Sequence, residues 1–177
     1  QLSLGFIGAS IGDSRKVLDM LLKLPNHKDF VNEKLHDGKT GFMHACLAGN
    51  LSAVQFRISF PSFNKNDIAA LVNEKDKNGC SGFVLACSKD QVDIVETLMN
   101  HERCKEFILA DDHFGLGFNE ASHTQSYGII KLFVKMSNFK DFVNYKNANG
   151  KTGFMNACQN GDTYLIDILL GKAKSPF

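Results

Sequence analysis

The sequence predicts an all-α solenoid: five helix-turn-helix repeats stacked in a row and joined by β-turns or short hairpins. The first observation is a Gly-Phe pair that occurs five times, at Gly5, Gly41, Gly82, Gly117 and Gly153, each with alanine four residues after the glycine. The second is the spacing of these glycines, 36, 41, 35 and 36 residues, where chance pairing of 15 Gly and 15 Phe would give about one such pair. The third is that apolar positions keep one register after every glycine, as expected when neighbouring repeats bury each other's apolar faces.

Each of these glycines is expected to open the first helix of its unit. With the glycine as position zero, phenylalanine occupies position one and alanine position four, a spacing typical of a short helix with one buried face. Thr40, Ser81 and Thr152 stand in the preceding N-cap position, whereas Leu4 and Leu116 offer no capping side chain. Position five holds small residues: Ser10, Cys46, Cys87, Ser122 and Cys158. We expect the three cysteines among them to be core residues, because a free cysteine packs as a small apolar side chain.

A second apolar stripe, at positions twelve, thirteen, sixteen and seventeen, predicts the second helix of each unit. Arg57 is the one residue in this stripe that is not apolar. Position nine precedes the stripe and holds Ser14, Asn50, Gln91, Ser126 and Asp162. Four of these five are good N-caps, so we expect their side-chain oxygens to accept a free amide at the start of the second helix.

The connections between units are expected to be short extended segments that enter tight turns. Val-Asn pairs at 31–32, 72–73 and 143–144 each precede, by six residues from the asparagine, a glycine suited to a turn. Three connections also carry a Lys-Asp/Glu-Phe triplet, at 28–30, 105–107 and 140–142, which we interpret as an added turn with phenylalanine under the second helix. The second connection is five residues longer than the others, within 59–70, and is either a tolerated loop or a functional insertion.

In these positions the chain resembles the ankyrin repeat, most closely from Val72 to Val95, which has the letters VNEKDKNGCSGFVLACSKDQVDIV. Thr-Gly-Phe at 40–42 and at 152–154 stands where that family has Thr-Pro-Leu. Glycine in place of proline is expected to weaken the start of the first helix. The family's histidine, two residues after the proline, is absent from all five units. Its hydrogen bond to threonine is therefore expected to be missing.

The resemblance implies one ankyrin-like domain over 1–177, with repeats at about 1–30, 31–71, 72–107, 108–142 and 143–177. It also implies a non-enzymatic module that binds a protein or peptide on its concave face. The alternative is a cytosolic structural or regulatory segment of a larger channel or enzyme. The first and last helices are unusually apolar for outer caps, so we expect further repeats or domains in the same parent chain.

In ankyrin-like stacks the turn tips and the exposed end of the first helix line the binding surface. The matching candidates are His36, Asp37, Lys39, Lys77, Asn78, Lys89, His113, Phe114, Leu116, His123, Asn149, Lys151 and Gln159. Phe114 and Leu116 stand out, because apolar side chains on a tip could anchor a partner. The alternative is that both fold inward, since the fourth unit is one residue short and lacks its threonine.

Composition excludes several other functions. Lys and Arg total 20 against 19 acidic residues, with no one-sided basic stripe, so nucleic acid is not an expected partner. No apolar run approaches the roughly 18 residues of a membrane span, so direct membrane insertion is not expected either. The five cysteines lack the spacing of a zinc site or disulfide framework, and the six histidines have no triad beside them. We therefore expect no cofactor, metal or catalytic residue, and a cytoplasmic location.

Overall fold

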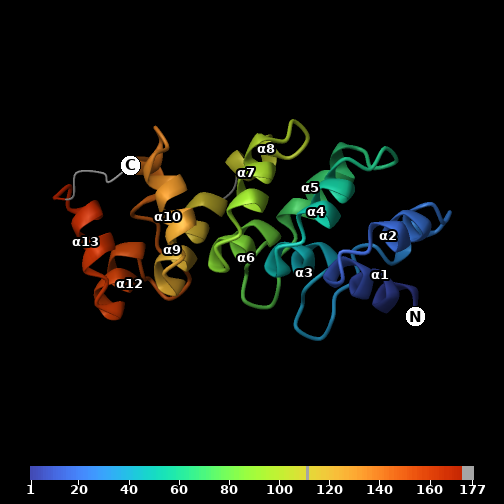
Figure 1. Ribbon diagram of the computed structural model, residues 1–177, viewed down its shortest axis with the longest axis horizontal. Helices are drawn as coiled ribbons and strands as arrows, with labels where there is room; N and C mark the ends of the chain where they lie inside the picture. The colour runs from blue at the N-terminus through green and yellow to red at the C-terminus, as the bar shows by residue number, and fades with distance from the viewer. Residues whose placement is uncertain (111, 173–177) are drawn as a thin grey trace.

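The computed structural model describes residues 1–110 and 112–172, and it is a row of five helix pairs stacked along one axis (Figure 1). The first helices of the pairs are α1 (Leu2–Ile11), α3 (Gly41–Ala48), α6 (Gly82–Ser88), α9 (His113–Thr124) and α12 (Gly153–Asn160). The second helices are α2 (Arg15–Leu22), α4 (Leu51–Ile58), α7 (Val92–Asn100), α10 (Tyr127–Val134) and α13 (Thr163–Leu169). Each first helix packs against the first helix of the next pair. The predicted all-α solenoid is confirmed.

Four short helices lie between the pairs: η1 (His27–Asp29), α5 (Lys65–Asn73), α8 (Lys105–Ala110) and α11 (Phe139–Phe142). η1, α8 and α11 supply the added turns that the Lys-Asp/Glu-Phe triplets predicted, whereas α5 follows the long second connection, which has no such triplet. The side chains of Phe30 and Phe142 are buried, and that of Phe107 is partly buried against the core. One expectation is wrong in detail. None of the three Val-Asn pairs is an extended segment: α5 continues through Val72 and Asn73, and residues 31–32 and 143–144 lie in turns that follow η1 and α11.

Three junctions carry the predicted tight turns, and those before α3 and α6 project from the lower edge of the array (Figure 1). In the first, the Gly38 amide donates to the Leu35 carbonyl at 2.9 Å and the Leu35 amide to the Lys39 carbonyl at 3.0 Å. The same pair of bonds closes the turns at 76–80 and 147–151. Gly38 has φ of +81°, a left-handed conformation that other residues adopt only with strain. Within the described ranges no β-strand forms, and Lys34 and Thr40 make a single antiparallel bridge.

The fourth junction differs from the other three. Helix α9 begins at His113, four residues before Gly117, and occupies the place where the other units have a turn and a capping residue. Phe114 therefore lies inside the array, stacked on Phe142 with ring centroids 5.4 Å apart and edge-on to Phe83 at 5.6 Å. The shortened fourth unit thus replaces a polar hairpin with an extra turn of helix.

The first helices are capped as the sequence predicts. The side-chain oxygens of Thr40, Ser81 and Thr152 accept the amide three residues ahead, at 3.3, 3.5 and 3.3 Å. The second helices depart from expectation. All five position-nine residues occupy the N-cap, but among them only Asp162 accepts an amide of its own helix, from Leu165 at 3.0 Å.

Two of the remaining second helices take a cap from the preceding unit. The Asp13 carboxylate accepts the Ala53 amide of α4 at 2.9 Å, and the Asp90 carboxylate accepts the Ile129 amide of α10 at 2.9 Å. Both aspartates have positive φ, +50° and +56°. This conformation, which aspartate tolerates better than most residues, aims each carboxylate across the junction.

The glycine at position zero has a role in packing between units that the sequence analysis did not predict. A Cβ built on Gly82 would lie 3.0 Å from Phe42 Cε1 and 3.1 Å from Cys46 Sγ, and one on Gly117 would lie 2.9 Å from Cys87 Sγ. Positions one and five of each unit therefore press against the bare Cα of the next unit's glycine. In the four later units a side chain at position zero would crowd the phenylalanine and the small residue of the preceding unit.

Position five also brings a correction. Cys46 and Cys87 are fully buried, as expected of core cysteines, but Cys158 is exposed. Its side chain occupies the face that a following unit covers in the first four repeats. No such unit follows among the described residues, so Cys158 does not belong to the core.

Arg57, the exception in the second stripe, is fully buried. One guanidinium nitrogen donates to the Val31 carbonyl at 3.2 Å, and the guanidinium carbon lies 4.6 Å from the ring centre of Phe6. Burial lowers the pKa of the Arg57 guanidinium to about 9. No carboxylate in the described part of the chain forms an ion pair with the guanidinium. Its charge instead makes a cation–π contact with the Phe6 ring.

The long second connection is folded rather than loose. Phe60 and Phe63 are buried, and their rings contact edge to face with centroids 5.5 Å apart. The guanidinium of Arg103, from the next unit, donates to the carbonyls of Ile58 at 3.0 Å and Phe60 at 3.2 Å, and also to that of Phe63. Arg103 thereby holds the insertion against the third unit.

Candidate partner-binding surface

The three hairpin turns each carry exposed side chains. The turns before α3 and α6 project from the lower edge of the array in Figure 1. Each turn is built by local polar contacts. The Asp76 carboxylate accepts the amides of Asn78 at 2.9 Å and Cys80 at 3.0 Å, and Asn147 accepts those of Asn149 and Lys151, both at 3.0 Å. These bonds occupy the residues at the base of each turn. The side chains at the tips are left facing outward.

A second row lies beside the turns, at the carboxyl ends of the first helices. Its exposed members are Lys89, His123 and Gln159, one from each of the last three units. Together with the exposed turn residues His36, Lys77, Asn78 and Asn149 they form what we call the tip face. These seven predicted binding residues have side chains in positions where a partner could reach them.

Two of the predicted binding residues are engaged inside the molecule instead. The Lys39 ammonium lies 3.2 Å from a buried Asp76 carboxylate oxygen and 3.4 Å from Asp37, so it bridges the first and second hairpins. Burial opposes ionisation of Asp37, but hydrogen bonding and charge from Lys39 hold the pKa of that carboxyl below its usual range. His44 lies 3.7 Å from Asp37, and burial lowers the pKa of its imidazole. This cluster joins adjacent hairpins.

Lys151 is also held, because its ammonium donates to the Gln159 side chain at 3.0 Å. Leu116, in the first turn of α9, is half-buried against the core. It therefore offers only part of its side chain to a partner.

His113 and Phe114 are corrections to the predicted surface. Both are buried, with exposed fractions of 1% and 5%. The ring of His113 bridges Ser81 Oγ at 2.9 Å and Asn73 Oδ1 at 3.1 Å, both in the third unit. The sequence suggested a tip because the fourth unit keeps the spacing of a turn, but the helix that forms there rotates both side chains inward. Of the two interpretations of Phe114, the inward one is correct.

Asn119 was not predicted to matter, and it links the fourth unit to the fifth. It occupies position two, where the resembled family has histidine. Its buried amide donates to the carbonyls of Lys151 at 2.8 Å and Tyr145 at 3.0 Å, both in the next connection. The sequence signal for this role is that Asn119 is the one polar residue at position two, where the other four units have apolar residues.

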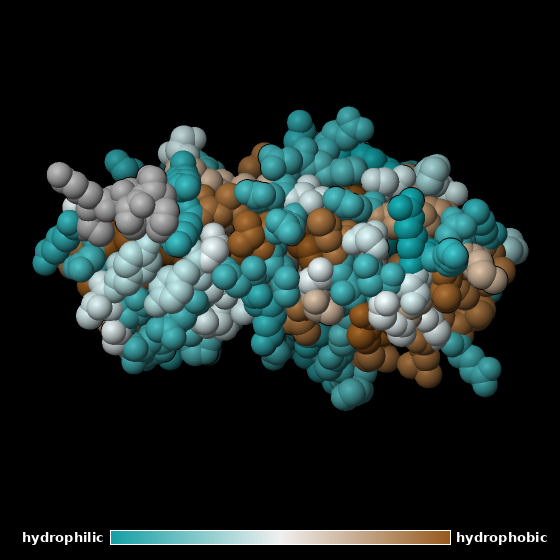
Figure 2. Space-filling view, in the orientation of Figure 1, coloured by the Kyte–Doolittle hydropathy of each residue, from teal (hydrophilic) through white to brown (hydrophobic). Residues whose placement is uncertain are grey.

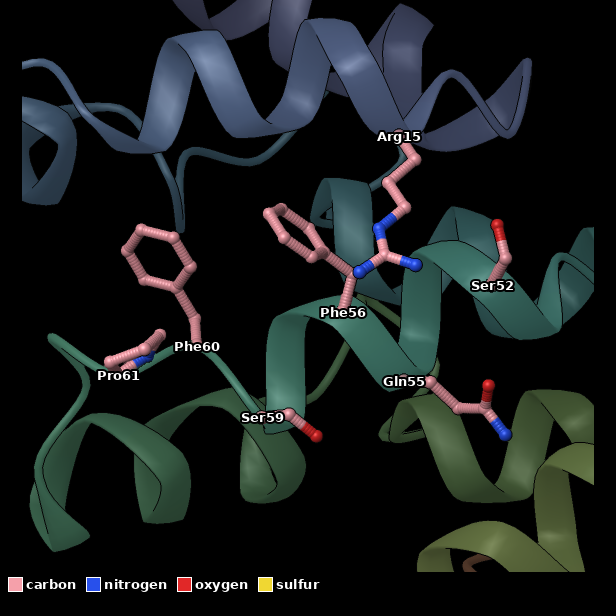
Figure 3. A pocket seen from close by; sticks show the side chains of 7 residues that line it. All are labelled: Arg15, Ser52, Gln55, Phe56, Ser59, Phe60 and Pro61. Carbon is pink, nitrogen blue, oxygen red and sulfur yellow. The ribbon is translucent and has the colours of Figure 1, made fainter.

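The opposite side of the array carries a hollow of about 370 Å³ between α2 and α4. Figure 3 shows the guanidinium of Arg15 beside the ring of Phe56, with Phe60 and Pro61 at the other end. The Arg15 guanidinium carbon lies 5.3 Å from the ring centre of Phe56. Polar side chains of Ser52, Gln55 and Ser59 complete the lining. The hollow contains none of the predicted binding residues, and it lies in the second-helix layer.

Two further features bear on the kind of site present. Among residues 1–110 and 112–172, no group of three or more His, Cys, Asp or Glu side chains is arranged to hold a metal ion. In those same residues, no helix combines the length and apolar character needed to cross a bilayer.

Stacked helix pairs with hairpin turns define a repeat protein, a class that presents an extended surface. A family model described as ankyrin repeats, in three copies, matches residues 6–111. The chain belongs to the ankyrin-repeat family, whose members are generally protein-protein interaction modules and typically non-enzymatic. The structure continues the same helix pairs beyond the matched region, in α9 to α13.

Proposed function

We propose that this chain is a protein-protein interaction module that binds a protein or peptide partner across the tip face, the concave surface of an ankyrin array. The observation that carries the proposal is that seven exposed polar side chains recur at the turns and first-helix ends of successive units. Repetition of the unit spaces these side chains regularly, which suits an extended partner better than a small molecule.

The ion pairs of the turns support the same proposal, because some charged side chains are bonded within the array and others are not. Lys39, Asp37 and Asp76 satisfy one another at the first junction, so the frame of the turns does not depend on a partner. Lys77 and Lys89, in contrast, form no ion pair among the described residues. A rigid frame with available polar groups binds with little loss of conformational freedom.

A cytoplasmic location is part of the proposal. All five cysteines are free thiols, which is typical of proteins from reducing compartments. Three of them, Cys46, Cys87 and Cys104, are buried, and burial raises the pKa of each thiol. These thiols are therefore packing groups in the proposed role.

The experiment begins with peptides selected from a random displayed library on the 177-residue chain. Binding of the selected peptides is then compared for Lys77→Ala/Lys89→Ala and for the charge-matched control Lys16→Ala/Lys140→Ala, whose exposed lysines lie away from the tip face. We expect the first variant to weaken binding by about tenfold, as loss of central interface residues does, and the control to bind normally. Equal binding by both variants, or loss only in the control, would refute the tip face as the binding surface.

A further inference from the structure

The hollow between α2 and α4 combines one cation with apolar walls, and no acidic residue of the described chain lines it. The cation is Arg15, and Phe56, Phe60 and Pro61 form the apolar walls (Figure 3). The other three lining residues are polar but uncharged. An anion that enters this hollow therefore meets a positive charge and no carboxylate of the lining.

The Arg15 side chain is held by an aromatic ring but has no anionic partner. Its guanidinium carbon lies 5.3 Å from the ring centre of Phe56. Within residues 1–110 and 112–172 the guanidinium forms no ion pair and donates no hydrogen bond. The edge of a stacked guanidinium can bind a carboxylate by two parallel hydrogen bonds. Because the stack orders the side chain in advance, less conformational freedom is lost when an anion binds.

Helix stability does not explain an arginine at this position. Arg15 is the first residue of α2, Lys16 is the second, and the first turn contains no acidic residue. A cation at the amino end of a helix opposes the helix dipole, whose positive end lies there. Departures of this kind from local preference are expected where a residue serves function.

The uncharged polar side chains of the lining differ in whether they are already bonded. Ser52 Oγ donates to the Asp13 carboxylate at 2.7 Å, and Ser59 Oγ lies 3.3 Å from His101 Nε2. The exposed Gln55 amide has no hydrogen-bond partner among the described residues. The guanidinium and this amide are therefore the two available donor groups of the hollow.

We propose that this hollow binds an acidic segment of a protein partner. A carboxylate of the segment accepts hydrogen bonds from Arg15 and Gln55, and a neighbouring apolar side chain packs against Phe56, Phe60 and Pro61. The positive charge of the lining and its lack of acidic residues select the anion, and the aromatic walls select the apolar neighbour. The site lies in the second-helix layer, so it is a second binding site in addition to the tip face.

The openness of the hollow favours a peptide over a small molecule. Its volume is about 370 Å³, and four of its seven lining residues are exposed. A small molecule there leaves much of its surface in water, unlike the ligands of enclosed pockets. A peptide extends past the rim, and Figure 2 shows apolar residues between polar ones on the side of the array where the second helices lie.

The test selects peptides from a random displayed library on the unmodified chain and discards those that also bind Arg15→Leu. We expect the remaining peptides to share an Asp or Glu beside an apolar residue. Replacing that acid by its amide should weaken binding to the unmodified chain by at least about tenfold, as loss of a charge-assisted hydrogen bond does, and leave binding to Arg15→Leu unchanged. An empty pool, peptides that share no acid, or equal effects on both proteins would overturn the proposal.

Two further variants locate the site. Lys16→Leu removes a neighbouring exposed charge of α2 that does not line the hollow, and it should bind the selected peptides normally. Gln55→Trp fills the hollow without a change of charge and should abolish binding. Gln55 is exposed, so the circular dichroism of this variant should match that of the unmodified chain. Peptides retained by Gln55→Trp, or lost equally from Lys16→Leu and Arg15→Leu, would overturn the proposal.

The tip face is tested separately by the same peptides. Lys77→Ala/Lys89→Ala should bind them normally, because both lysines lie on the tip face and neither lines the hollow. Arg15→Leu should in turn keep the peptides that depend on Lys77 and Lys89. Loss of the selected peptides from Lys77→Ala/Lys89→Ala would place their binding on the tip face and overturn the second site.

Discussion

Gly82 lies so close to Phe42 that a methyl group on its Cα would approach the ring atom Cε1 to 3.0 Å. The two residues belong to successive units, and the phenylalanine ring is fully buried, so neither side has room to move. The paired choice of glycine and phenylalanine is therefore a property of the junction rather than of either helix. It explains how a residue that weakens a helix start can recur in the four later units.

Gly82→Ala should destabilise the protein, because the new methyl group overlaps a ring that cannot leave the core. We expect the free energy of unfolding to fall by roughly 1–3 kcal/mol, the usual cost of overpacking. Gly5→Ala is the matched control, since it gains helix propensity of roughly 0.5–1 kcal/mol and meets no described atom within 4 Å. Urea unfolding followed by circular dichroism measures both. Equal effects at the two glycines would contradict the close contact.

Arg57→Met should preserve or increase stability at neutral pH. The guanidinium is fully buried without a carboxylate partner among the described residues, so its charge costs desolvation energy that methionine avoids at similar volume. We expect the free energy of unfolding to rise by roughly 1–4 kcal/mol. Arg57→Ala, which leaves a cavity, should instead lower it by roughly 2–5 kcal/mol. A loss in the methionine variant would show that the contact with Phe6 outweighs the desolvation.

Lys39→Met should be destabilising even though Lys39 lies beside the tip face. The substitution leaves the Asp76 carboxylate, whose side chain is 1% exposed, without its cation. Removing one partner of a buried pair costs about 3 kcal/mol or more. In Lys39→Met/Asp76→Asn the charge is gone as well, so much of that loss should be recovered. A double-mutant cycle in urea measures the coupling, and additive losses would contradict the ion pair.

Arg103→Ala should loosen the insertion between α4 and α5. The guanidinium donates to the carbonyls of Ile58, Phe60 and Phe63, and lysine cannot reproduce this forked geometry. We expect chymotrypsin to cleave after Phe60 or Phe63 several times faster in both Arg103→Ala and Arg103→Lys, because local opening exposes these bonds. Ser62→Ala, at an exposed residue of the same insertion, is the control. Unchanged cleavage in the Arg103 variants would show that packing alone retains the segment.

Acid should destabilise the protein through His101. Burial, assisted by the Arg103 charge, lowers the pKa of this imidazole below its ordinary value of 6.5, and its Nδ1 accepts the Arg103 amide at 3.3 Å. The unfolded chain then binds a proton more readily than the folded one. This contribution to stability is present above pH 6.5 and is lost as pH falls through the folded pKa. His101→Gln should show a shallower fall between neutral and mildly acidic pH, and identical slopes would exclude this role.

Periodicity was enough to predict the helix pairs, their registers and the caps of the first helices, because these depend on local spacing. It could not predict features that depend on two units at once. The sequence around Asp13 gives no sign that its carboxylate caps α4, since the bond spans 40 positions of the chain. Burial of Phe114 likewise follows from a helix that forms where the spacing suggested a turn. The candidate surface was therefore predicted in part, with its buried members misplaced.

The aspartates that cap a neighbour's helix have a consequence for how the array comes apart. A unit whose predecessor has opened loses packing and also the group that closes the amide end of its own second helix. Part of the free energy of α4 and α10 thus resides in the contact between units, and nearest-neighbour coupling of this kind sharpens an unfolding transition. Fraying at the first unit should therefore weaken the second, and opening of the third should weaken the fourth.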